Sequence, residues 1–355
     1  MELLIGNEKV FLDFLDSITK KDRVAILSHT DCDGVSSAVI LEQILNAKKI
    51  KPVLIELLNY DKYMLEKMAP KLRSLNISKV FVCDLALDND NLDLFETFRK
   101  EFNTLLIDHH PPHPDLKNKQ NILKAISLSE TGDCTTMIVY ELGKKLFNYK
   151  KWTWLVCAAT IADFYFKNPK TLKFIKKIYP GTDADKIFES KPGKFASAID
   201  FSLIYYKEKG KSLLGVFNLV KKKDIKSLEL CRKTIQKKID AGIKDYLANA
   251  EFYPEKNLYF YYNSSVGAES SAIIASIISN KYHPDKTIIL LKASSNPGFI
   301  RINLRNQKGD VDTNLLVKKG IIGLEHASGG GHSKASGGQI LQKDVDKFRA
   351  NILAA

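Results

Sequence analysis

The chain has 355 residues, of which 45% are hydrophobic and 27% are charged, a balance that indicates a globular protein with a sizeable core. It contains no apolar run near the roughly 20 residues that cross a bilayer, and Met1–Lys20 lacks the features of a signal peptide. Its five scattered cysteines form no Cys-x-x-Cys pair, so we expect a cytoplasmic protein with reduced thiols, no membrane partner and no zinc ribbon. The net charge of +13 favours a polyanionic partner, although a lysine-rich composition alone also produces such a charge.

The first predicted strand runs into a turn that is rich in acidic residues. Val24–Leu27 is an apolar run typical of a buried parallel strand, and the spacing of Val35–Leu45 predicts a helix. The turn between them carries His29, Asp31 and Asp33. Such a turn lies at the carboxyl edge of a parallel sheet, where open α/β sheets bind ligands, and its charged groups repel one another unless a cation lies among them. The alternative is a turn that only caps the helix, with Asp33 as the N-cap.

Apolar strands and helical patterns continue to alternate after this turn. The further strands are predicted at Pro52–Leu58, Val80–Cys83 and Thr104–Ile107, and the helices around them at Glu8–Ser17, Lys62–Leu75 and Asn91–Phe102. Strand and helix in alternation predict an α/β domain with a doubly wound, mainly parallel sheet.

Acidic residues and histidine follow two more of these strands. Asp84 comes directly after Val80–Cys83, and Asp108 with His109 comes after the next strand. One acidic strand end can simply start a turn, but three such ends side by side are hard to explain in that way. Carboxylates and imidazoles without thiolates suit Mn²⁺ or Mg²⁺, and enough ligands are present for a pair of ions, which can hold both reacting oxygens in phosphoryl hydrolysis.

A further acid interrupts the apolar, helix-like segment Trp154–Phe166. Asp163 is costly among so many apolar side chains unless it is neutralised or bound to a metal. We therefore expect Asp163 to be another ligand, with a solvent-exposed helix end as the alternative.

The middle of the chain is lysine-rich and helical. Lys221–Ala250 predicts one long helix, which at 1.5 Å per residue would span roughly 45 Å and could connect two domains. Its basic face could line a groove for a phosphodiester chain, or it could simply be solvated.

The C-terminal part returns to strands and helices. Strands are predicted at Leu258–Tyr262, Thr287–Lys292 and Phe299–Arg305, with a helix at Ser270–Ser279. Strand alternation places Arg301, Asn303 and Arg305 on one face, where the two arginines could clamp a phosphate or lie on an edge strand in solvent.

A glycine-rich segment then surrounds one histidine. Gly329, Gly330 and Gly331 precede His332, and backbone N–H groups of such a run can approach an anion closely. A flexible loop is the alternative. The segment lacks the endings of a nucleotide P-loop and of a dinucleotide-binding turn, which disfavours an NTP- or NAD-using enzyme.

These motifs together resemble the DHH phosphoesterase family with its C-terminal DHH-associated domain. The N-terminal motifs that carry the resemblance are His29-x-Asp31-x-Asp33-Gly34, Asp84, Asp108-His109-His110 and Asp163. The C-terminal motif is Gly329-Gly330-Gly331-His332 with Ala335 and Gly337. The resemblance implies a metal-binding catalytic domain over residues 1–185, a helical linker over 186–250 and a smaller α/β substrate-binding domain over 251–355.

The resemblance also assigns roles to the residues. The expected metal ligands are His29, Asp31, Asp33, Asp84, Asp108, His109 and Asp163, for two divalent ions, Mn²⁺ or alternatively Mg²⁺. Asp84 would bridge the ions, and His110 would face the scissile phosphate. Arg301, Arg305, Gly329, Gly330, Gly331 and His332 would hold substrate phosphates. His29 lies closer to Asp31 than the corresponding histidine does in pyrophosphatase-like and nanoRNase members, so a supporting role behind the ligands is also open.

The expected function is a two-metal exonuclease that hydrolyses single-stranded DNA, RNA or short oligonucleotides to mononucleotides. One alternative is a phosphodiesterase or phosphatase that acts on linear or cyclic dinucleotides or on adenosine bisphosphate. A less favoured alternative is a catalytically silent scaffold of a replication complex. Partners beyond nucleic acid would be a second copy of the chain or a replication or repair protein.

Overall fold

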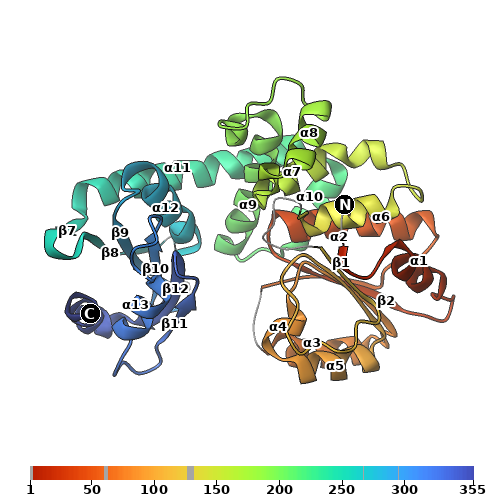
Figure 1. The fold of residues 1–355 in the computed structure, drawn as a ribbon, viewed down its shortest axis with the longest axis horizontal. Helices are drawn as coiled ribbons and strands as arrows, with labels where there is room; N and C mark the ends of the chain where they lie inside the picture. The colour runs from red at the N-terminus through yellow and green to blue at the C-terminus, as the bar shows by residue number, and fades with distance from the viewer. Residues whose placement is uncertain (1–2, 60–62, 126–131, 267, 295) are drawn as a thin grey trace. The chain divides into compact units, whose positions relative to one another are not determined.

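The computed structural model describes residues 3–59, 63–125, 132–266, 268–294 and 296–355. The chain divides into two compact units (Figure 1), the first formed by Met1–Tyr206 with Ser212–Arg232 and the second by Lys207–Lys211 with Lys233–Ala355. All three breaks between the units fall within the predicted linker, and its boundaries at residues 185 and 250 stay predictions. Within the described ranges, every helix is too short or too polar to cross a membrane.

A six-stranded sheet forms the centre of the first unit, in the order β1-β6-β5-β4-β2-β3. The strands are β1 (Leu3–Ile5), β2 (Val24–His29), β3 (Leu54–Leu58), β4 (Lys79–Cys83), β5 (Thr104–Asp108) and β6 (Ile122–Ala125). All neighbours pair in parallel except β1, which runs antiparallel to β6. The predicted mainly parallel sheet is therefore confirmed.

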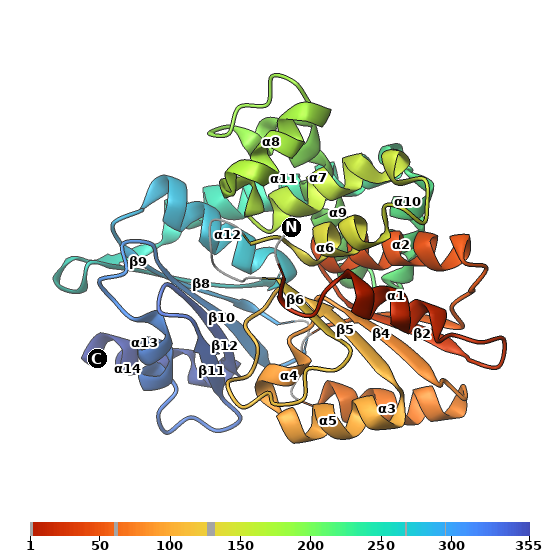
Figure 2. The same ribbon diagram turned by 45° about the vertical axis from the view of Figure 1, so that its right-hand side comes forward.

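Helices cover both faces of this sheet, as Figure 2 shows. Along β2, Val24 and Ile26 enter one apolar core while Ala25 and Leu27 enter the other, because successive side chains of a strand point to opposite faces. The first core is completed by α1 (Glu8–Asp16), α2 (Cys32–Ala47), α6 (Thr135–Gly143) and α7 (Thr153–Ala162). The second is completed by α3 (Met64–Ser74), α4 (Leu87–Asp90) and α5 (Leu92–Glu101). The predicted helix Lys62–Leu75 corresponds to α3, and its first residue, Lys62, lies outside the described residues.

The lysine-rich middle of the chain is helical, but the long helix predicted there is interrupted. The helices are α8 (Pro169–Ile178), α9 (Lys191–Glu208), α10 (Leu214–Lys222) and α11 (Ile225–Asn249). Lys223 adopts the left-handed conformation that ends α10. The side chain of Asp224 then accepts the backbone N–H of Ser227, which starts α11. The C-cap at Lys223 and the N-cap at Asp224 therefore interrupt the predicted helix and produce two separate helices.

The second unit has its own six-stranded sheet, in the order β11-β12-β10-β9-β8-β7. The strands are β7 (Glu251–Tyr253), β8 (Leu258–Val266), β9 (Thr287–Ala293), β10 (Phe299–Asn306), β11 (Ser328–Gly331) and β12 (Ala335–Leu341). Only β8 and β9 pair in parallel among these described strands. Ile300, Ile302 and Leu304 of β10 pack into one core with α13 (Thr313–Gly320) and α14 (Val345–Ala354).

Candidate metal centre

Three neighbouring strands of the first sheet end in candidate ligands. β2 ends at His29, β5 ends at Asp108, and Asp84 follows β4, which lies between them. The parallel order therefore brings these side chains to one edge of the sheet. Asp84 has a φ of +61°, a left-handed conformation that is strained for an aspartate and that often marks a functional site.

The acidic turn after β2 is fixed by the start of α2. Asp31 is the N-cap, and its Oδ1 accepts the Gly34 N–H at 2.8 Å. A Cβ atom on Gly34 would lie 2.3 Å from the carbonyl oxygen of His29, so only glycine permits this close return of the chain. The N-cap role that the sequence alternative gave to Asp33 belongs to Asp31.

Asp33 is fully buried and contacts a different helix. Its two oxygens accept the backbone N–H groups of Thr135 at 2.7 Å and of Thr136 at 2.8 Å. These donors belong to the N-terminus of α6, where the helix dipole favours a carboxylate. This contact could not be predicted from the sequence, because the two threonines follow Asp33 by about a hundred residues.

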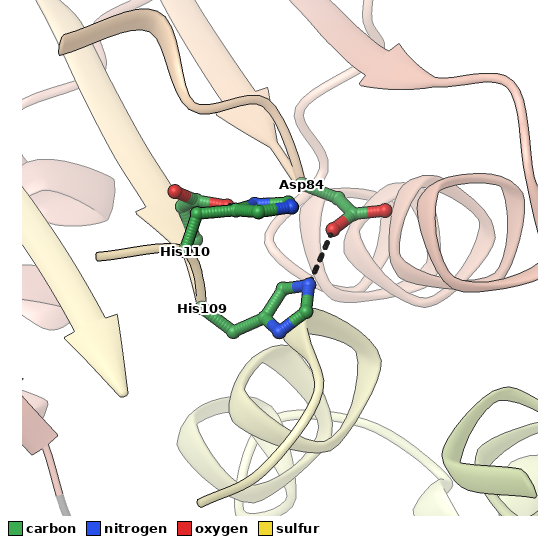
Figure 3. A group of neighbouring side chains, drawn as sticks. Asp84, His109 and His110 are labelled. Atoms are coloured by element: carbon green, nitrogen blue, oxygen red, sulfur yellow. Dashed lines mark hydrogen bonds and ion pairs between the residues drawn. The ribbon is translucent and has the colours of Figure 1, made fainter. Parts of the chain in front are cut away.

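One group of ligand atoms comes from Asp33, Asp84, His109 and Asp163, which each offer an atom within 4.8 Å of the others. His109 Nε2 lies 3.1 Å from Asp84 Oδ1, a contact drawn as a dashed line in Figure 3, and 3.3 Å from Asp163 Oδ2. The other ring nitrogen, Nδ1, lies 2.8 Å from the hydroxyl of Tyr165. The tyrosine therefore orients the ring so that Nε2 faces the carboxylates.

A second group comes from His29, Asp31 and Asp84, again within 4.8 Å. His29 Nδ1 lies 2.7 Å from Asp31 Oδ2 and 3.8 Å from Asp84 Oδ2. Burial opposes the charged imidazole, but hydrogen bonds and the charges of these two carboxylates outweigh it and raise the pKa of His29 to about 10. Asp84 belongs to both groups and lies at their junction.

The carboxylates fit a divalent cation because two of their buried oxygens accept no hydrogen bond within the described part of the chain. Asp84 Oδ2 and Asp163 Oδ2 accept no hydrogen bond from the described residues. Burial, and then repulsion from neighbouring aspartates, raises the pKa of both carboxyls well above the usual range. A bound cation would offset both the burial of these charged carboxylates and the repulsion between them.

The thiols around the centre do not offer soft ligands. Cys32, Cys83 and Cys134 are fully buried, and burial followed by the charges of nearby aspartates raises the pKa of each thiol. They therefore stay protonated at neutral pH. The available donors are carboxylate oxygens and imidazole nitrogens, which suit hard or borderline divalent ions.

Asp108 makes contacts that the sequence did not reveal. It lies within 4.8 Å of ligand atoms of Asp84, His109 and His110. However, its Oδ2 also lies 2.9 Å from the Nζ of Lys124, which is fully buried and contacts Asp88 Oδ1 at 2.7 Å. Lys124 Nζ donates a third bond to the carbonyl oxygen of His110. The only sequence signal for this ion cluster was a single lysine within the apolar run of β6.

The imidazole of His110 is oriented by Asp108. His110 Nδ1 lies 2.7 Å from Asp108 Oδ1, and its side chain is 42% exposed. Figure 3 shows the rings of His109 and His110 together beside Asp84. Asp108 thus holds His110 with one oxygen and Lys124 with the other.

The arginines predicted to bind phosphate lie in the second unit. Arg301, Asn303 and Arg305 do share one face of β10, which carries contacts to α12 (Ser271–Ile277) and the residues before it. Arg305 Nε donates to Ser276 Oγ, and Asn303 donates to Ser271 Oγ. Arg301 is 43% exposed and lies 3.7 Å from Glu269.

The glycine-rich segment forms a strand pair in the structure. Gly329, Gly330 and Gly331 belong to β11, which pairs antiparallel with β12. A Cβ atom on Gly338 of β12 would lie 2.1 Å from the carbonyl oxygen of Ser328, so the glycines permit close pairing of the two strands. His332 is exposed in the tight turn that follows.

Solved structures share this fold along nearly the whole chain. A manganese-bound exonuclease RecJ covers 99% of this chain and 94% of its own, with a TM-score of 0.73 and 14% identity. RecJ from Thermus thermophilus with Mn²⁺ covers 98% of this chain but only 54% of its own, with a TM-score of 0.72 and 15% identity. The DHH domain of a member of the S1p family of ribosomal proteins covers 98% of this chain and 89% of its own, with a TM-score of 0.66 and 17% identity. No match was found among curated protein sequences.

The fold and the site define a metal-dependent hydrolase of phosphoester bonds. Residues 23–166 match the N-terminal domain of the DHH family, and residues 255–355 match the DHHA1 domain. The chain belongs to the DHH phosphoesterase family, as its motifs predicted.

Proposed function

We propose that the protein is an exonuclease that hydrolyses single-stranded DNA, RNA or short oligonucleotides to mononucleotides. The observation that carries this proposal is the fold match to exonuclease RecJ, which spans both units and 99% of the chain. The basic composition, with 54 lysines and arginines against 41 acids, supports a polyanionic substrate.

We assign two divalent ions to the centre, with Mn²⁺ as the expected ion and Mg²⁺ as the alternative. One ion would be held by Asp33, Asp84, His109 and Asp163, and the other by His29, Asp31 and Asp84. Asp84, which belongs to both groups, would serve as the bridge between the ions. Divalent ions in such a centre lower the pKa of a bound water and neutralise phosphate charge.

His110 would act on the substrate directly. Asp108 holds Nδ1 of His110, so that Nε2 can donate a hydrogen bond to a phosphate oxygen or a proton to the leaving oxygen. Asp108 would orient His110 through one oxygen, and it also remains a proposed ligand of the centre, because one of its oxygens lies within 4.8 Å of ligand atoms of Asp84, His109 and His110. Arg301, Arg305, His332 and the glycines at 329–331 remain the proposed phosphate-binding residues of the second unit.

The direct test uses single strands labelled at the 5′ or the 3′ end, incubated with Mn²⁺ or with Mg²⁺. We expect stepwise shortening and release of mononucleotides, with loss of about a thousandfold or more in rate for Asp84→Asn because a bridging carboxylate is removed. Turnover of dinucleotides without shortening of longer strands would favour the small-molecule phosphodiesterase instead. Binding of partners without any hydrolysis would favour the scaffold.

A further inference from the structure

Three phenylalanines, of which Phe164 and Phe188 are exposed and Phe166 is half-buried, form a cluster that begins next to Asp163 in the chain. The ring of Phe164 lies 6.1 Å from that of Phe166 and 5.6 Å from that of Phe188, measured between centroids. The rings of Phe166 and Phe188 lie 5.9 Å apart at 90°. We call these three residues the Phe164 cluster. All of them belong to the first unit.

The exposure of the rings and the backbone conformation of Phe164 are both unfavourable for the stability of the folded protein. Phe164 is 54% exposed and Phe188 is 47% exposed, although a large apolar side chain is normally stabilised by burial. Phe164 also has a φ of +61°, the left-handed region that bulky residues rarely adopt. Strained and exposed apolar positions of this kind concentrate at binding sites.

The Phe164 cluster is adjacent to the candidate metal centre in the sequence. Asp163, a candidate ligand, directly precedes Phe164, and the next residue, Tyr165, contacts His109 through its hydroxyl at 2.8 Å. Phe164 and Phe166 on either side of Tyr165 instead pack with Phe188, which belongs to the short helix Ile187–Glu189. The cluster and the centre are therefore built from one segment of chain.

Exposed lysines adjoin the cluster. The Nζ of Lys167 lies 5.7 Å from the centre of the Phe164 ring. α8 begins shortly after and carries exposed lysines at one face, while Ile175 on the opposite side is buried. These lysines are Lys170, Lys173, Lys176 and Lys177. None of them forms an ion pair with a described residue, so their charges are available to a polyanion.

We propose that the Phe164 cluster stacks nucleobases of a single-stranded nucleic acid while the α8 lysines hold its phosphates. A strand of nucleic acid offers both an aromatic face and a regular series of negative charges, which this surface complements. An apolar protein partner would gain little from the lysines. The inference rests on the proposed function for its substrate class, but it concerns binding and not hydrolysis.

The test measures binding without cleavage. The full chain in EDTA is titrated into a single strand that contains 2-aminopurine, whose fluorescence reports stacking, and the affinity is measured by anisotropy at several salt concentrations. We expect Phe164→Ala and Phe188→Ala each to weaken binding about tenfold and to remove part of the fluorescence change. Lys170→Gln with Lys173→Gln should lower the salt dependence, by roughly one unit of log–log slope for each phosphate that the protein no longer neutralises.

Tyr282→Ala provides the matched control. Tyr282 is 40% exposed with Lys281 at 5.7 Å from its ring, but it belongs to the second unit and has no exposed phenylalanine cluster beside it among the described residues. We expect it to bind as the wild type does. Circular dichroism verifies that each variant is folded, and Phe164→Trp, which keeps an aromatic face, should restore binding if Phe164→Ala loses it.

The outcomes separate this inference from the proposed function. A wild type that binds no single strand, or phenylalanine variants that bind as the wild type does, would overturn the stacking site. Equal weakening toward inorganic polyphosphate, which has no bases, would also overturn it. Stacking through Phe164 in a protein that hydrolyses no strand with Mn²⁺ would support this inference and refute the exonuclease.

Discussion

The Nζ of Lys124 lies 2.9 Å from Oδ2 of Asp108, and both side chains are fully buried. The same ammonium group lies 2.7 Å from Asp88 Oδ1, so one lysine neutralises two buried carboxylates. Asp88 Oδ2 in turn accepts the backbone N–H of His113. This ion cluster fixes both ends of the segment that carries His109 and His110.

Replacing Lys124 by methionine should therefore destabilise the protein strongly. The substitution keeps the volume of the side chain but leaves Asp88 and Asp108 buried without a counter-charge, a loss of about 3–5 kcal/mol in the free energy of unfolding. Urea unfolding measures it. Lys117→Met, at an exposed lysine, should change stability by less than about 0.5 kcal/mol. Equal effects of the two substitutions would contradict the role of the ion cluster.

Tyr165 should affect metal binding through His109. Tyr165→Phe removes the hydroxyl that lies 2.8 Å from His109 Nδ1 and orients the ring. Loss of such a supporting hydrogen bond typically weakens metal affinity about 10- to 100-fold. Calorimetric titration with Mn²⁺ would measure the change. The melting temperature of the metal-free variant should stay near that of the wild type, and unchanged affinity would show that the hydroxyl is dispensable.

Asp163 should be unfavourable for stability when no cation is present. Burial and the neighbouring Asp33 and Asp84 raise the pKa of Asp163, which means that its charged form is disfavoured in the folded protein. Asp163→Asn should therefore raise the melting temperature of the protein in EDTA by a few degrees, because the neutral amide is not repelled by the neighbouring carboxylates. The same variant should gain less stability than the wild type when Mn²⁺ is added. Calorimetric scans with and without the ion test both expectations, and a lower melting temperature in EDTA would refute the first.

The stability difference between Asp163→Asn and the wild type in EDTA should depend on pH, because the pKa of Asp163 is raised in the folded protein. Between the usual pKa of an aspartate and the raised pKa of Asp163, the folded state binds more protons than the unfolded state. The contribution of Asp163 to stability therefore falls as pH rises through this window, and it is largest at low pH. The advantage of Asp163→Asn over the wild type in EDTA should therefore grow as the pH rises above about 4, the usual pKa of an aspartate. An advantage that shrinks with rising pH would show that the pKa is not raised.

The strand-end acids were accessible to sequence reasoning because a parallel sheet obeys a simple rule. β2, β4 and β5 are short apolar runs, and the residue after each run must lie at the same edge as the others. Asp163 was predicted as a ligand for a related reason, since a lone acid in an apolar segment requires a partner. Lys124 had the same signature within β6, but its partners could not be named.

Side-chain contacts between segments far apart in the chain could not be predicted from the sequence. Asp33 accepts N–H groups of Thr135 and Thr136, and Lys124 reaches back to Asp88, because α6, β6 and α4 pack around the strand ends. No local propensity encodes these pairs. The exposed face of Phe164 is a similar case, since the apolar run around it predicts a buried helix and says nothing about which ring is exposed.

The α/β fold, the family and the residue types of the candidate metal centre could all be predicted from the sequence alone, because strand periodicity and motif order are local properties. Which of the buried carboxylate oxygens accept hydrogen bonds within the described residues depends on the tertiary structure. Asp84 and Asp163 keep buried oxygens without a hydrogen-bond partner among the described residues, whereas both oxygens of Asp108 contact Lys124 and His110. This difference between the carboxylates depends on how the helices and strands pack, because packing decides which residues from distant parts of the chain contact each oxygen.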